Sequence, residues 1–169
     1  TEAKVLSALI TSANFNPNDK TYGNQLRAVA VLEPLFKAYP NHPGIAHYLI
    51  HSYDYPPIAK NGLPAAKVYA SIAPDAAHAL HMPSHIFTRT GHWKDSIAAN
   101  RESARVAGDA SFDGHHAADY VVYAYLQLAQ DNAARAAMSA SLGMKAIDHF
   151  GAAFAYAAMP ARVALESGD

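Results

Sequence analysis

The chain of 169 residues contains no cysteine, which excludes disulfides, thiolate metal ligands and cysteine nucleophiles. It has no excess of basic residues either, since thirteen Lys and Arg stand against fourteen Asp and Glu. Nucleic acid is therefore an unfavourable partner, because proteins that bind the phosphate backbone are usually strongly basic. Glycine-rich phosphate loops, the GxSxG elbow and the HExxH zinc motif are also missing. The most apolar stretch, 150–165, is interrupted by Pro160 and Arg162 and is too short to span a membrane.

Alternation of apolar and polar residues, which is typical of β-strands, is nearly absent, whereas Ala and Leu recur at helical spacing. Because 51% of the residues are apolar and 16% are charged, the chain can bury a core and is not disordered. We expect one all-α domain over residues 1–169 and, because helical patterns run nearly to both ends, a piece of a longer protein. The predicted helices are 3–15, 22–38, 43–54, 63–72, 76–90, 93–107, 115–129, 133–146 and 151–166.

The breaks between the predicted helices repeat every 34 residues. Pro40, Pro74 and Gly108 keep this interval, each in the break after the second helix of a pair. A helix-turn-helix unit of 34 residues is the period of tetratricopeptide repeats. The segment 91–97 (GHWKDSI) resembles the turn of that family, with glycine followed two residues later by an aromatic residue. The resemblance covers most of the chain and implies a right-handed superhelix of about four helical hairpins with a concave groove.

Histidine is unusually frequent, with ten copies, and several copies keep the same period. Ten histidines scattered at random over this length would give about half a pair at any one separation. Within each repeat the pairs are four residues apart, so both side chains lie on one helix face, one turn apart. That spacing lets a single helix supply two imidazoles to one metal ion. The two columns with the 34-residue step are His47, His81 and His115, and His51, His85 and Asp119.

These columns predict a metal site in the concave groove. Imidazoles with a carboxylate and no thiolate suit a transition metal, most simply Zn or Cu, rather than Ca or Mg. Four histidines with the carboxylate make a closed site, and three with a water make an open one suited to catalysis. Two alternatives remain: a metal-free polar groove for a peptide, partner protein or small anion, and a purely structural role. The candidate ligands are His47, His51, His81, His85, His115 and Asp119, and the candidate groove residues are His78, Asp54 and Tyr48.

The repeat also predicts which histidines share a surface. His47, His81 and His115 should lie on adjacent helices and on one face. Pro83 falls between His81 and His85, where it should start or kink a helix. Either effect could turn His81 away from His85 or open the groove. We assign no site role to the histidines that carry no pattern of their own, which are His42, His92, His116 and His149.

Two segments carry a narrower resemblance. Residues 42–51 (HPGIAHYLIH) and 78–87 (HALHMPSHIF) resemble a group of bacterial tetratricopeptide-like proteins with HPGxxHYxIH and HxxHMPSHI segments. This resemblance implies the helical-repeat fold and the histidine-lined groove, but no particular reaction. Members of the group are often longer and exported, which implies an exported or periplasmic location.

Overall fold

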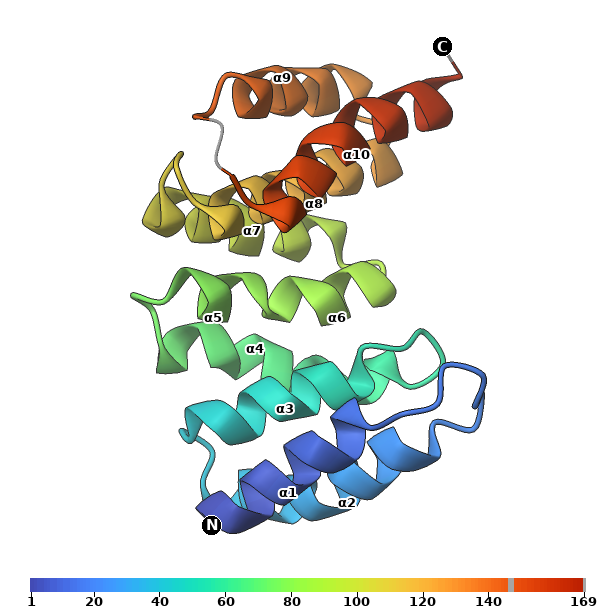
Figure 1. Cartoon of the computed structure of the whole chain (residues 1–169), viewed down its shortest axis with the longest axis vertical. Coiled ribbons are helices and arrows are strands. Elements are labelled where there is room, and N and C mark those ends of the chain that lie inside the picture. Colours follow the sequence, from blue (N-terminus) through green and yellow to red (C-terminus); the bar gives the residue numbers. More distant parts are fainter. Residues whose placement is uncertain (146–147, 169) are drawn as a thin grey trace.

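The computed structural model describes residues 1–145 and 148–168, and every regular element within them is helical. The prediction of an all-α chain is therefore confirmed for this part. The helices lie across the long axis, layer on layer, from α1 and α2 at one end to α9 and α10 at the other (Figure 1). None of the described helices has both the length and the apolarity needed to cross a membrane. The elements are α1 (Glu2–Ala13), α2 (Gly23–Ala38), α3 (Pro43–Tyr53), η1 (Ala59–Gly62), α4 (Leu63–Ile72), α5 (Ala77–His81), α6 (Pro83–Arg89), α7 (Trp93–Ala107), α8 (Phe112–Gln127), α9 (Asp131–Leu142) and α10 (Phe150–Ser167).

The predicted and observed helix boundaries agree closely in most of the chain, because proline and glycine mark the breaks. The exception is the predicted helix 76–90, which the structure divides into α5 and α6. Pro83 has no backbone N–H and cannot continue the hydrogen-bond ladder of α5, and the amide of His85 bonds instead to Met82 O at 3.2 Å. The predicted end of the helix 133–146 lies outside the described residues, and α9 ends at Leu142.

Two apolar cores hold the layers together. One joins α1 to α6 around fully buried side chains such as Leu32 and Ile50. The other joins α8, α9 and α10 around Val122 and Met159. Helix α7 packs between them, against α5, α6 and α8. It buries three polar side chains there, which are Ser96, Asn100 and Ser103. Buried polar groups need hydrogen-bond partners, so we expect buried polar contacts to concentrate in this middle layer.

The close approach of η1 to α6 can be tested at Gly62. A Cβ atom on Gly62 would lie 2.8 Å from Ile86 Cδ1 and 3.0 Å from Tyr53 Cβ. Overpacking a filled core costs about 1–3 kcal/mol, so Gly62→Ala should lower the free energy of unfolding by about that amount in urea denaturation. Gly44→Ala is the control, because its Cβ would meet nothing closer than 3.4 Å. Equal stability of the two variants would contradict the tight packing.

Candidate metal centre

Six histidines from α3, α5, α6 and α8 form a band of imidazole rings across the middle of the stack. Their ring nitrogens fall into two groups, and within each group the possible ligand atoms all lie within 4.8 Å of one another. The groups adjoin, since the ring centroids of His51 and His85 are 6.4 Å apart. The first triad is His47, His51 and His78, and the second triad is His81, His85 and His116.

The first triad is centred on His47. Its Nε2 lies 3.0 Å from His51 Nε2 and 3.2 Å from His78 Nε2. The ring of His47 is stacked on Tyr48 and on Tyr69, with centroid distances of 5.2 and 5.4 Å. Burial, with the neighbouring imidazoles, lowers the pKa of His47 to about 3. His47 is therefore neutral at pH 7, while His51 and His78 remain exposed to solvent.

The second triad is more enclosed. His81 is only 2% exposed, and its Nε2 lies 3.0 Å from His85 Nε2. His116 completes the group, with its ring centroid 4.6 Å from that of His81 and its face stacked on Phe112. Burial and the nearby imidazoles hold the pKa of His81 well below its ordinary value, and they also lower that of His116. These two rings are uncharged at neutral pH.

Asn100 determines which nitrogen of His81 carries the proton. The Asn100 side chain is fully buried, and its Nδ2 donates to Ser96 O at 2.8 Å. That bond turns Oδ1 towards His81 Nδ1, 2.6 Å away. An amide oxygen can only accept, so His81 Nδ1 must donate. In the neutral ring, the lone pair is then on Nε2.

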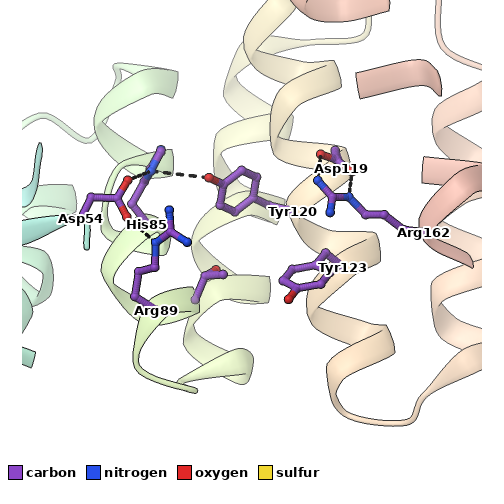
Figure 2. A pocket seen from close by; sticks show the side chains of 8 residues that line it. Asp54, His85, Arg89, Asp119, Tyr120, Tyr123 and Arg162 are labelled. Carbon is purple, nitrogen blue, oxygen red and sulfur yellow. Dashed lines mark hydrogen bonds and ion pairs between the residues drawn. The ribbon is translucent and has the colours of Figure 1, made fainter. Parts of the chain in front are cut away.

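Asp54 does the same for His85. Its Oδ2 lies 2.8 Å from His85 Nδ1, and its Oδ1 accepts from Arg89 Nε at 2.9 Å, as Figure 2 shows. Burial acts to raise the pKa of Asp54, but the bonds from His85 and Arg89 outweigh it and hold that pKa below its usual value. The ionised carboxylate accepts from His85 Nδ1–H, and in the neutral ring Nε2 carries the lone pair.

When both rings are neutral, two lone pairs face each other across 3.0 Å, at His81 Nε2 and His85 Nε2. They repel unless a proton or a metal ion lies between them. Burial holds the pKa of His81 well below its ordinary value, so His81 Nε2 is available as the hydrogen-bond acceptor or metal ligand of that contact. Zn–N bonds are about 2.0–2.1 Å long, which places two donors on a tetrahedral ion about 3.4 Å apart. The observed separation needs to open by only a few tenths of an ångström, so both triads have the donors and the spacing to hold a metal ion.

Most of the predicted site residues lie in this band. The four central candidates, His47, His51, His81 and His85, are divided between the two triads. Pro83 does not separate the last two. The predicted groove residues also have places in it: His78 completes the first triad, Tyr48 stacks on His47, and Asp54 bonds to His85.

His115 and Asp119 lie elsewhere. His115 is fully buried and its Nε2 lies 3.0 Å from Lys145 O. Asp119 accepts two hydrogen bonds from Arg162 of α10, at 2.8 and 3.1 Å. The pair shares one face of α8, as its spacing predicts, but that face packs against α10. His115 therefore does not align with His47 and His81 as expected, and neither residue belongs to a triad.

The residue of α8 that sequence analysis missed is His116. Counted from the first residue of the helix, His47, His81 and His116 are each the fifth residue of α3, α5 and α8. These helices begin 34 and then 35 residues apart, so a fixed 34-residue step points to the wrong neighbour. The signal that marks the start of α8 is Ser111, whose Oγ accepts from Gly114 N at 3.1 Å as an N-cap.

The lowered histidine pKa values make stability depend on pH. The pKa values of His47, His51, His81 and His116 lie below 6.5 in the folded protein, so below about pH 6.5 the unfolded chain binds more protons. The free energy of unfolding of the metal-free protein should fall between about pH 7 and pH 5 in urea titrations. A double variant, His47→Gln with His81→Gln, should show a smaller slope. Stability that rises on acidification would contradict the buried neutral imidazoles.

Comparison with protein-family models, with curated proteins and with solved structures finds no match to this chain. The resemblance to tetratricopeptide repeats therefore stays a prediction. What the described residues establish is an all-helical stack and two histidine triads with metal-ligand spacing.

Proposed function

We propose that this protein binds a transition metal ion, Zn²⁺ or Cu²⁺, through the second triad, and a further ion more weakly through the first. The observation that carries the proposal is the facing pair of Nε2 atoms on His81 and His85, whose Nδ1 protons are bonded to Asn100 and Asp54. Partners of this kind orient metal-ligating imidazoles and raise their basicity.

The donor set favours these metals over others. Neutral imidazole nitrogens suit Zn and Cu, whereas Ca²⁺ and Mg²⁺ prefer oxygen ligands. Three imidazoles leave a fourth coordination position for water, as in catalytic zinc sites. Bound water of this kind loses a proton near neutral pH. We therefore include a metal-dependent activity in the proposal, without assigning its reaction.

The second triad should be the tighter site. The rings of His81 and His85 are held by burial and by hydrogen bonds, and His116 is stacked on Phe112, so little side-chain freedom remains to be lost when an ion binds. His51 and His78 of the first triad are exposed, and within residues 1–145 and 148–168 their side chains form hydrogen-bond contacts only with His47. The conformational entropy lost when these two side chains are ordered would oppose metal binding, so the first triad should have the lower affinity.

We also propose that the band lies in the groove of a tetratricopeptide-like superhelix. The support is the recurrence of one helix position: the fifth residue of α3, α5 and α8 is histidine in each case. A ligand face built from equivalent positions of successive units is what a repeat architecture provides.

Zinc titration of the metal-free protein tests the site. His85→Ala should weaken zinc binding by more than about 100-fold, since it removes a ligand and not only a supporting contact. His92→Ala is the matched control and should bind as the parent does, because His92 contacts Thr90 and Phe87 outside the band. Small equal losses for both variants would mean diffuse surface binding. No zinc binding at all would favour the metal-free alternative, a groove for a peptide or partner protein.

The supporting carboxylate gives a separate prediction. Asp54→Asn should weaken zinc binding about 10–100-fold, because an amide holds His85 Nδ1–H less strongly than a carboxylate does. Asp75→Asn, an exposed residue in the break after α4, makes the same charge change away from the band and should have little effect. Competition with a chromogenic chelator measures both affinities. Equal affinities would show that Asp54 does not support the site.

A further inference from the structure

A pocket adjoins the second triad, with walls from α6, α8 and α10. Its volume is about 270 Å³, several times the ~30 Å³ of one water molecule, so it has room for a small organic molecule. In Figure 2 Arg89 lies on one side of it and Arg162 on the other, with Tyr120 and Tyr123 between them. His85 lines the pocket as well as the triad.

The carboxylates of the pocket already have donors on every oxygen. Asp54 accepts from His85 and from Arg89, one bond on each oxygen. Both oxygens of Asp119 accept from Arg162. The two bonds to Asp119 fix the plane of the Arg162 guanidinium, and the bond to Asp54 holds Arg89 by its Nε. Asp54 and Asp119 therefore line the pocket as carboxylates that are already paired with donors of the protein.

The pocket lining also holds hydrogen-bond donors that are not yet used. Within residues 1–145 and 148–168, Arg89 uses only Nε and Arg162 uses only Nε and Nη2 in hydrogen bonds. Tyr120 OH is 3.5 Å from His85 Nδ1, which cannot accept because its proton is directed to Asp54. Burial raises the pKa of Tyr120 to about 12, so its O–H stays a donor.

We propose that this pocket binds a small molecule through a carboxylate or phosphate group placed between Arg89 and Arg162. The planar N–H donors of guanidinium groups match the oxygens of such anions. The rings of Tyr120 and Tyr123 supply flat walls for the body of the ligand. Because His85 adjoins both sites, we assign small oxyanions as the substrate class of the metal-dependent activity, and this last assignment alone rests on the proposed function.

Titration of metal-free protein tests the pocket without the metal. Inorganic phosphate and succinate are the two probes, followed by calorimetry and by NMR of the arginine Nε–H groups. Binding should saturate at one site and shift the signals of Arg89 and Arg162. Arg89→Gln should lose about 10-fold or more in affinity, as expected for one charge-assisted hydrogen bond. The Arg89 side chain is 44% exposed, so the variant should fold, which circular dichroism checks.

Two further variants make the result specific. Tyr120→Phe keeps the ring that forms part of the pocket wall and should weaken binding several-fold through loss of its O–H alone. Arg101→Gln makes the same charge change as Arg89→Gln on an exposed arginine that lies over Tyr125, and it should leave affinity unchanged.

The outcomes separate the proposals. Saturable binding of phosphate, of succinate or of both supports the oxyanion site and identifies the preferred group. No saturable binding of either probe up to about 10 mM, or equal losses for Arg89→Gln and Arg101→Gln, overturns it. Zinc binding without anion binding would refute this inference alone, and anion binding without zinc binding would refute the proposed metal site and the substrate assignment but not the pocket.

Discussion

The position of one proton on His81 determines the chemistry of the histidine band. That proton is held on Nδ1 by Asn100, and Asn100 is itself oriented by the backbone carbonyl of Ser96. A buried amide is unfavourable unless its polar atoms are paired, and here both ends are paired. The buried polar face of α7 thus fixes the tautomer of His81, as Asp54 orients His85, and the two Nε2 atoms converge. Without that face, His81 would be free to take the other tautomer.

Local sequence patterns were sufficient to predict most of the helices and five of the six histidines in the band, four as metal ligands and His78 as a groove residue. Most breaks carry proline or glycine, which disfavour a continued helix for steric reasons that depend on few neighbours, although Pro34 and Pro160 lie inside α2 and α10. His81 and His85 were predictable because residues four apart on a helix lie on the same face, one turn apart. Although Pro83 interrupts the helix between them, their Nε2 atoms are 3.0 Å apart.

Contacts between distant helices were not predictable from the same patterns. The hydrogen-bond partners of Asn100 and Arg162 lie 19 and 43 residues away in the sequence, and no sequence periodicity predicts such pairs. His116 was missed because the third helix start comes one residue late, and one residue turns a side chain by about 100° around the helix axis. The columns of a repeat can therefore be read from sequence only where each helix start is placed to the residue.

Asp119 and Arg162 show how one ion pair serves both architecture and chemistry. The Asp119 side chain is only 4% exposed, so it needs the guanidinium group as a partner. The pair joins α8 to α10 beside the second apolar core. Both residues of the pair also line the pocket. The ion pair that joins α10 to α8 therefore also forms part of one wall of the pocket.

Helix α5 has five residues, yet it contributes His78 to one triad and His81 to the other. A helix this short is not stable alone in water, and its order comes from the helices around it. One short segment therefore carries a ligand of each triad, three residues apart. The distance between the two triads is set by the packing of these five residues.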